Sequence, residues 1–298
     1  MPATTILDAL KSGKILTADG AWGTMLHKKG LAPGDCPEVW NLERFGEVKG
    51  VAEGYVAAGA EIVKTNSFGA NRFRLAHFGF ADNTALINRQ AARASREAAG
   101  GGVWVMASVG PTGKLLIAED VTAEELYEAF VEQVTALEEG GADAVCVETM
   151  SDVGEAKAAI KAAKENTRLQ VFCTFSFDKT PRGEFRTMMG VSPGEAALAC
   201  IAAGADVVGT NCGNGIELMV EITKEIKAAA PEALLLVQAN AGLPRRENGL
   251  DVFPDTPGYM AGFVRALLDA GANIIGGCCG TTPEHIAAIK AAVHGSRS

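Results

Sequence analysis

A joint of small residues followed by an apolar run recurs four times along the chain. Each copy has alanine or glycine, then glycine, alanine and an acidic or amide residue, and it follows a segment with helical spacing of its apolar positions. The glycine suits the end of a helix, and the apolar run suits a buried strand. The copies lie at residues 58–63, 140–145, 203–208 and 270–275. The repeat therefore predicts four units in which a helix leads directly into a strand.

Four more apolar runs lie between these joints and predict the remaining strands. They are bounded by turn or polar residues and occupy residues 14–19, 103–108, 171–175 and 234–239. Segments with helical patterns separate the strands, and the clearest are residues 83–99, 122–139, 192–203 and 258–270. Eight strands that alternate with helices within 298 residues are typical of a (β/α)8, or TIM, barrel. We therefore predict an α/β fold with a single barrel domain that spans residues 1–298.

Polar residues of the kind that bind ligands stand at the ends of all eight predicted strands. In chain order they are Asp19, Asn66, Ser108, Glu148, Ser176, Cys212, Asn240 and the pair Cys278 and Cys279. Active sites of (β/α)8 barrels lie at the C-terminal ends of the strands. The regular recurrence of such residues at one level therefore predicts a site at the mouth of the barrel.

The cysteines at two of these strand ends predict a metal site. Cys212 is followed by glycine, and Cys278 and Cys279 lie within Gly-Gly-Cys-Cys-Gly. Three soft thiolates leave a tetrahedral zinc ion one ligand short, which is the arrangement of a catalytic zinc rather than a structural one. The open position would take a substrate thiol, which loses its proton more readily on the metal. The alternatives are a strained vicinal disulfide or apolar packing, and the glycines argue against packing because they fill space poorly.

Asp19 and Glu148 form an acidic pair at the predicted mouth. Such a carboxylate can be a general acid or base, a metal ligand, a helix cap or a clamp for an ammonium group. Because zinc would already have three soft ligands, we favour the ammonium clamp. The turn after Asp19, with Gly23 and Thr24, offers backbone N–H groups that suit a carboxylate. Together with a thiophilic metal, these groups describe an amino acid that carries a thiol.

Three more polar residues and four aromatic residues are candidates for supporting roles. Asn66, Ser108 and Asn240 are expected to position the substrate or tune the metal, or else to satisfy loop backbone. The side-chain oxygen of Asn240 is expected near the metal when no thiol is bound. Aromatic faces stabilise quaternary ammonium or sulfonium groups. The aromatic residues that could reach the mouth, although each also suits loop packing, are Trp22, Trp40, Phe68 and Tyr259.

Composition and charge narrow the range of partners. A net charge of −9 without a basic cluster argues against nucleic acid. There is no apolar run of membrane-spanning length, and the first residues do not form a secretory signal. The seven cysteines are an odd number and several lie in apolar runs, as expected in a reducing compartment. We therefore expect a cytoplasmic protein with no nucleic-acid or membrane partner.

These motifs together resemble the zinc-dependent homocysteine S-methyltransferases, which include betaine–homocysteine methyltransferase and the homocysteine domain of cobalamin-dependent methionine synthase. The resemblance runs along nearly the whole chain. The motifs that carry it are residues 19–24, 65–70, 108–113, 148–149, 211–213, 240–242 and 276–285. The resemblance implies a (β/α)8 barrel with zinc on Cys212, Cys278 and Cys279. It also implies homocysteine held by Asp19, Glu148 and the turn after Asp19, with methionine as the product.

The resemblance leaves two classes of methyl donor open. Residues 187–193 look most like short bacterial enzymes described as using betaine. However, Gly69 and Thr149 stand where betaine enzymes of the animal type carry tyrosines, so their aromatic cage is not carried over. Trp22 and Trp40 could form a different cage for an onium donor. The expected donor is therefore an onium compound such as betaine, or a methyl-corrinoid supplied in trans by a separate carrier protein.

The leading hypothesis is a zinc-dependent transferase that moves a methyl group directly to the thiolate of homocysteine. One alternative keeps the zinc and the barrel but changes the acceptor to a different thiol or a selenol. Another is a subunit of a corrinoid system that is inactive without its carrier protein. A purely structural zinc site is disfavoured because a closed site would need a fourth protein ligand.

Overall fold

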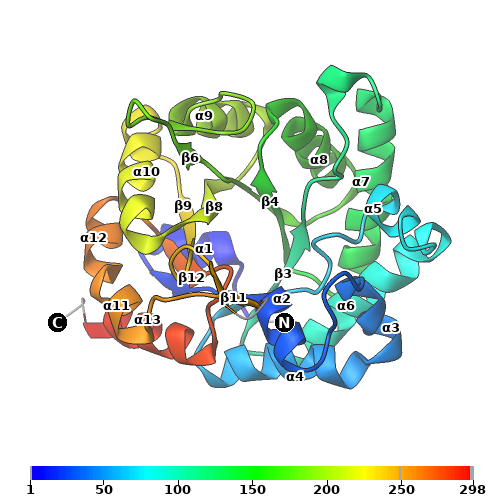
Figure 1. Ribbon diagram of the computed structural model, residues 1–298, viewed down its shortest axis with the longest axis horizontal. Helices are drawn as coiled ribbons and strands as arrows, with labels where there is room; N and C mark the ends of the chain where they lie inside the picture. Colours follow the sequence, from blue (N-terminus) through cyan, green and yellow to red (C-terminus); the bar gives the residue numbers. More distant parts are fainter. Residues whose placement is uncertain (1, 248–249, 296–298) are drawn as a thin grey trace.

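Eight parallel strands form the central sheet of the protein. The computed structural model describes residues 2–247 and 250–295 and is shown in Figure 1. The strands follow the order β1-β12-β9-β8-β5-β4-β3-β2, and an isolated bridge between Ala18 and Ile62 joins the two ends of the sheet. The sheet therefore closes on itself, and the helices form a ring around it. The predicted single-domain (β/α)8 barrel is confirmed.

The barrel strands are short and almost completely buried, as expected for parallel strands covered on the outside by helices. They are β1 (Leu16–Thr17), β2 (Ile62–Lys64), β3 (Trp104–Val109), β4 (Ala144–Met150), β5 (Gln170–Phe175), β8 (Val207–Gly215), β9 (Leu235–Asn240) and β12 (Ile274–Gly277). Each predicted strand overlaps one of these, and the four joints lead into β2, β4, β8 and β12 as predicted. Strand β1 is shorter than expected because Ala18 pairs only through the isolated bridge.

The outer helices follow the strands in alternation. They are α4 (Phe45–Ala57), α6 (Thr84–Ala99), α7 (Ala123–Glu139), α8 (Val153–Asn166), α9 (Pro193–Ala203), α10 (Ile216–Ala229), α11 (Pro257–Gly262), α12 (Val264–Asp269) and α13 (Pro283–Gly295). Capping boxes at Thr122 and Ser192 fix the starts of α7 and α9. The single helix predicted over 258–270 is wrong, because the chain makes a tighter bond from Phe263 N to Met260 O that separates α11 from α12.

Short elements complete the chain at the two ends of the barrel. They are α1 (Ile6–Lys11), α2 (Trp22–Lys28), α3 (Trp40–Glu43), α5 (Arg72–Ala76), the hairpin strands β6 (Asp178–Lys179) and β7 (Phe185–Arg186), and the hairpin strands β10 (Arg245–Glu247) and β11 (Leu250–Val252). Helix α1 packs Ile6 and Leu10 against the side chains inside the barrel. It lies at the centre of the ring in Figure 1 and closes the end of the barrel opposite the C-terminal ends of the strands.

Two distortions of the sheet lie at the ends of β4 and β8. The register between β4 and β5 shifts between Val147 and Met150, and that between β8 and β9 shifts between Asn211 and Gly215. Such bulges bend a strand and redirect its side chains. None of the helices that the structure describes is both long and apolar enough to cross a membrane.

Candidate active site

A cavity of about 320 Å³ opens at the C-terminal ends of the barrel strands. Its wall comes from the segments that follow β1, β2 and β12 and from the ends of β3, β4 and β8. The predicted site residues in that wall are Gly23, Thr24, Asn66, Ser108, Glu148, Cys212, Cys278 and Cys279. Asp19 and Asn240 are not part of it. The residues predicted from six strand ends therefore meet around one cavity, as active sites of this fold do.

The three predicted thiols converge in this wall. The sulfur atoms of Cys212, Cys278 and Cys279 all lie within 4.8 Å of one another, and those of Cys212 and Cys279 are 3.7 Å apart. Zinc bound tetrahedrally by thiolates at about 2.3 Å would separate its sulfurs by about 3.8 Å. All three side chains are partly exposed, so a small molecule can reach them. The spacing and the donor type fit a zinc ion with one open position.

The backbone around Cys212 takes an unusual conformation. Cys212 has a φ of 59°, in the left-handed region that side chains rarely adopt, and it lies inside the bulge of β8. Thr149, next to Glu148, also has a φ of 59° and lies at the bulge of β4. Such backbone persists where the surroundings fix it, and it is common at functional sites. In both strands the distortion coincides with a predicted site residue.

The glycines around Cys278 are needed by the protein itself. A Cβ on Gly277 would lie 2.3 Å from Oγ1 of Thr281, and a Cβ on Gly276 would lie 2.8 Å from the carbonyl oxygen of Asp19. The Thr281 hydroxyl donates to the carbonyl of Cys278 and accepts from the N–H of Ala21. These close contacts bind the cysteine loop to the segment after β1. The glycines therefore allow Thr281 to approach this backbone closely.

The thiols share negative charge before any metal is considered. Hydrogen bonds from Cys278 and then from Cys279 lower the pKa of Cys212 to about 3. The same bonds, together with burial, raise the pKa of Cys278 well above its usual value. A hydrogen bond from Asn240 also favours the Cys212 thiolate. The Oδ1 atom of Asn240 is buried and has no hydrogen-bond partner in the described part of the chain. A thiolate held by two thiols is a site prepared for a soft cation.

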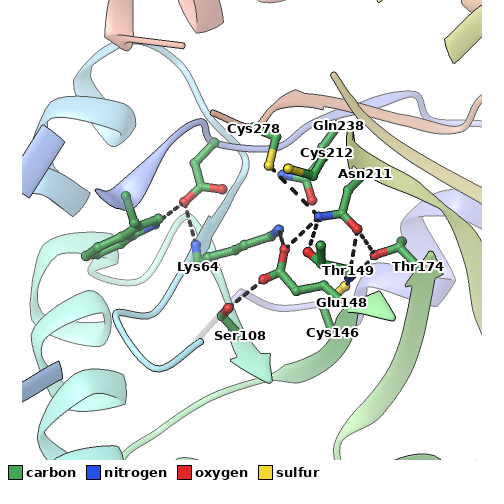
Figure 2. Close-up of polar contacts among 12 residues, drawn as sticks. Lys64, Ser108, Cys146, Glu148, Thr149, Thr174, Asn211, Cys212, Gln238 and Cys278 are labelled. Carbon is green, nitrogen blue, oxygen red and sulfur yellow. Dashed lines mark hydrogen bonds and ion pairs between the residues drawn. The ribbon is translucent and has the colours of Figure 1, made fainter. Parts of the chain in front are cut away.

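Glu148 sits at the centre of a buried polar network (Figure 2). Its Oε1 accepts from the Ser108 hydroxyl at 2.5 Å. Its Oε2 accepts from Lys64 Nζ at 2.6 Å and from the Asn211 amide at 3.3 Å. Glu148 and Lys64 are both 5% exposed. The predicted ammonium clamp therefore already holds the ammonium group of a lysine.

Lys64 was not predicted from the sequence as a site residue. It ends β2 in the run Ile62-Val63-Lys64, and a charged residue at the end of an otherwise apolar run was the signal that could have identified it. Burial alone would lower the pKa of Lys64, but the charge of Glu148 and, more weakly, that of Asp19 raise it above its usual value. The charge of Glu148 therefore favours the protonated form of Lys64 in the cavity wall.

Asp19 supports the wall from outside the cavity. Its Oδ2 accepts from the backbone N–H of Lys64 at 2.7 Å and from the indole of Trp22 at 2.9 Å. Its Oδ1 is buried without a hydrogen-bond partner among the described residues. Burial raises the pKa of Asp19 to about 6, although the charge of Lys64 opposes this shift. Asp19 fixes the segments after β1 and β2 relative to each other.

The other predicted residues divide between lining and support. Thr24 lines the cavity, and its hydroxyl accepts from the N–H of Gly280 at 3.1 Å, next to the cysteine pair. The amide of Asn66 donates to the carbonyl of Pro37 at 2.7 Å and to Asn41 Oδ1 at 3.0 Å, so it holds the loop before α3. Both residues shape the wall through contacts within the protein.

Two of the four aromatic candidates reach the cavity. Trp22 and Phe68 line it. Trp40 does not, because it is 6% exposed and packs with the guanidinium of Arg44 4.6 Å from its ring. Tyr259 is exposed on α11 and donates its hydroxyl to Glu217. Trp22 and Trp40 therefore do not form an aromatic cage together.

Asn211 is a second residue that was not predicted as a site residue, although it lies in the motif at 211–213. Its Oδ1 accepts from the N–H of Thr149 at 2.9 Å and from the hydroxyl of Thr174 at 2.7 Å. Its Nδ2 lies 3.9 Å from the sulfur of Cys278, in addition to its contact with Glu148. One amide thus joins the thiols to the carboxylate network, as Figure 2 shows.

The sequence matches the family model of the homocysteine S-methyltransferases over residues 16–293. Among curated proteins, the chain is 30% identical to a methionine synthase of Mycobacterium tuberculosis (strain ATCC 25618 / H37Rv) over 308 residues. It is 29% identical to a methionine synthase of Mycobacterium leprae (strain TN) over 308 residues. Each alignment covers 97% of this chain and 25% of the relative, so the chain spans about a quarter of the length of these relatives.

Solved structures show the same fold. The homocysteine methyltransferase MmuM from Escherichia coli, in its metallated form, matches with a TM-score of 0.77 and 23% identity over 95% of this chain and 98% of that chain. A methyltransferase from Methanosarcina mazei matches with a TM-score of 0.61 and 12% identity over 98% of both chains. At these identities the likeness is one of fold.

Proposed function

The chain belongs to the homocysteine S-methyltransferase family, and from this premise we propose that it transfers a methyl group to the thiolate of homocysteine, with methionine as the product. We propose that Cys212, Cys278 and Cys279 hold a zinc ion that binds the substrate thiol. The observation that carries the proposal is the convergence of these three sulfurs in the wall of one cavity. The all-sulfur donor set supports zinc over a hard cation, because hard cations prefer oxygen ligands.

A zinc ion at this place supplies one chemical effect: it lowers the pKa of a bound substrate thiol, so that a thiolate is present at neutral pH. The residues of the chain provide the rest. Glu148 gives the substrate ammonium a negative partner, and Ser108 and Asn211 hold that carboxylate in place. The segment with Gly23 and Thr24 forms the facing wall.

Methyl transfer then proceeds as a direct displacement. The substrate sulfur forms a bond to the methyl carbon while the bond from that carbon to the donor breaks, and the bonding electrons leave with the donor. Alignment of the two reactants in the cavity supplies much of the acceleration. Trp22 and Phe68 line part of the wall and give it apolar surface.

The proposed donor is an onium compound such as betaine, or a methyl-corrinoid supplied in trans. Trp22 and Phe68 provide two aromatic faces that suit an onium group. With a methyl-corrinoid as the donor, the methyl group would be delivered by a corrinoid carrier protein. A corrinoid carrier is therefore a proposed partner.

A donor screen tests the function. Zinc-loaded protein is incubated with homocysteine and with betaine, a sulfonium donor, methyltetrahydrofolate or methylcobalamin, and methionine is measured. Turnover with an onium compound would identify a self-sufficient enzyme. Turnover only with methylcobalamin would identify a subunit that needs a corrinoid carrier. Binding of homocysteine without turnover would exclude the four donors, whereas failure to bind homocysteine would contradict the proposal.

The alternative acceptor, a different thiol or a selenol, has its own test. An acceptor without an amino group would not need the charge of Glu148, so Glu148→Gln, whose side-chain oxygen can still accept from Lys64, would reduce its methylation less than that of homocysteine. With homocysteine as the acceptor, the same variant is expected to lose at least about ten-fold in kcat/KM, because a charge-assisted hydrogen bond to the substrate is removed.

A further inference from the structure

Lys64 is the cationic side chain in the cavity wall, and no other lining residue in the described chain carries a permanent positive charge. It is buried, at the end of β2, and it faces the same cavity as the three thiols. A buried charge is costly unless it is paired and hydrogen-bonded. Lys64 therefore needs partners for its charge in this wall, and one of them is Glu148.

Lys64 uses only some of its hydrogen-bond donors within the described part of the protein. An ammonium group has three N–H donors. Within the described residues, Lys64 donates one hydrogen bond, to Oε2 of Glu148. Two donors of a buried ammonium group thus remain for another acceptor, and the cavity is the place from which it can come.

The carboxylate of Glu148 also has an acceptor position without a hydrogen bond from the described residues. Each carboxylate oxygen can accept two hydrogen bonds. Its Oε2 accepts from Lys64 and Asn211, whereas its Oε1 accepts only from Ser108. The pair therefore offers two donors on Lys64 and one acceptor position on Glu148 to a molecule in the cavity.

This combination matches the zwitterionic end of an amino acid. An α-ammonium and an α-carboxylate group are separated by two bonds, and the opposite charges of Lys64 and Glu148 are also in contact, at 2.6 Å. The carboxylate of the substrate can face Lys64 while its ammonium faces Glu148, so that each charge meets its opposite. In the turn after β1 the N–H of Ala21 is already bonded to Thr281, whereas the uncapped N–H groups at the start of α2 can share the carboxylate with Lys64.

On the basis of the proposed function, we propose that Lys64 binds the α-carboxylate of homocysteine and makes the site specific for thiols that are α-amino acids. Lys64 then has two tasks. It pairs with Glu148 in the free protein, and it shares its remaining donors with the substrate in the complex. A thiol that lacks the carboxylate leaves those donors without a partner and binds less tightly.

The test compares three thiols by calorimetric titration of zinc-loaded protein. They are homocysteine, 3-aminopropane-1-thiol, which lacks the carboxylate, and 4-sulfanylbutanoate, which lacks the ammonium group. Wild-type protein is expected to prefer homocysteine over 3-aminopropane-1-thiol by about 10- to 100-fold, the range of a charged hydrogen bond. Lys64→Met is expected to reduce this preference to less than about three-fold, mainly because the variant binds homocysteine more weakly.

Two further variants separate recognition from structure. Lys64→Met leaves Glu148 buried without its cation, so the double variant Lys64→Met with Glu148→Gln removes both charges and should show the same loss of preference. Lys179→Met removes a lysine from an exposed ion pair with Glu221 and should keep the wild-type preference. Lys64→Arg keeps the positive charge and should retain part of the preference for homocysteine.

The outcomes distinguish this inference from the proposed function. If wild-type protein binds homocysteine but Lys64→Met and the double variant keep the full preference over 3-aminopropane-1-thiol, Lys64 only holds Glu148 and the inference is wrong. If the two variants bind homocysteine and 3-aminopropane-1-thiol more weakly by the same factor, the inference is also wrong. If wild-type protein binds none of the three thiols, the proposed function fails, and the inference fails with it.

Discussion

The side-chain amide of Asn211 lies 3.3 Å from Oε2 of Glu148 and donates a hydrogen bond to it. Because Asn211 directly precedes Cys212, and its amide nitrogen is 3.9 Å from the sulfur of Cys278, this contact links the proposed ammonium clamp to the thiols. Residues that orient metal ligands in this way commonly change metal affinity by 10- to 100-fold when they are replaced.

Asn211→Ala is expected to weaken zinc binding by roughly ten-fold or more, because the ends of β4 and β8 lose a shared anchor. Competition with a chromophoric zinc chelator measures this change. Asn214→Ala is the matched control, since Asn214 is buried on the same strand but donates to the carbonyl of Phe177 at 2.6 Å. The control is expected to lose stability while keeping its zinc affinity. Equal zinc affinity in Asn211→Ala and wild type would show that the amide has no part in the metal site.

Single replacements of Cys212, Cys278 or Cys279 by serine are expected to remove both zinc and activity. A serine oxygen is a harder and less acidic ligand than a thiolate, and two remaining thiolates hold zinc poorly. Metal analysis of the purified variants should fall from about one zinc per chain to near zero. Cys200→Ala, a buried cysteine on α9, should retain the metal. A zinc-free Cys279→Ser protein with full activity would exclude the proposed mechanism.

Asp19→Asn is expected to change how stability depends on pH. Burial raises the pKa of Asp19 from its ordinary value of 3.8 to about 6, so the folded protein binds the proton more tightly than the unfolded chain does. Its contribution to stability is therefore complete below about pH 4 and is lost as the pH rises through 6. The variant has no such loss, and its stability relative to wild type should increase between pH 4 and 7 by up to about 3 kcal/mol.

Urea unfolding of the metal-free protein at several pH values measures this difference. The asparagine oxygen can still accept from the N–H of Lys64, so the fold itself should persist. A difference between variant and wild type that stays constant from pH 4 to 7 would mean that Asp19 has the same pKa in the folded and unfolded chains.

Gly209→Ala is expected to destabilise the barrel by about 3 kcal/mol or more, or to prevent folding. A Cβ at Gly209 would lie 1.9 Å from the carbonyl oxygen of Leu236, which belongs to the backbone of the adjacent strand β9. The control is Gly46→Ala on α4, where a Cβ meets nothing within 4 Å. This control should raise the free energy of unfolding by a few tenths to about 1 kcal/mol, because alanine favours helix. Thermal unfolding of the two variants separates these outcomes, and similar midpoints would refute the steric argument.

The sequence predicted the architecture well because the signals were local. Each joint of small residues encodes a helix end and a strand start within six positions, and the alternation of eight strands with helices has few other solutions. The helix expected over 258–270 was the exception. There a local hydrogen bond from Phe263 N to Met260 O interrupts the helix.

The composition of the cavity was only partly predictable. The cysteines and Glu148 could be recognised because their residue types are rare at strand ends and chemically distinctive. Lys64 and Asn211 could not, because their roles depend on contacts between strands that are far apart in sequence, 84 residues for Lys64 with Glu148. Trp40 was one of the aromatic residues that could have reached the mouth, but its large apolar ring is buried next to Arg44, in line with the alternative of loop packing.

The position of Cys212 and Cys279 on either side of β9 has a consequence for folding. The two residues are 67 positions apart in sequence, on β8 and two residues beyond the end of β12, and β9 lies between these strands in the sheet. A metal held by both is a cross-link that closes the intervening chain into a loop and penalises its unfolded states. Partial opening of this last quarter of the barrel then requires release of the ion. Metal loading should therefore slow the exchange of the amide hydrogens of β9 and β12 more than that of β2 and β3, and it should protect this quarter most strongly against proteolysis.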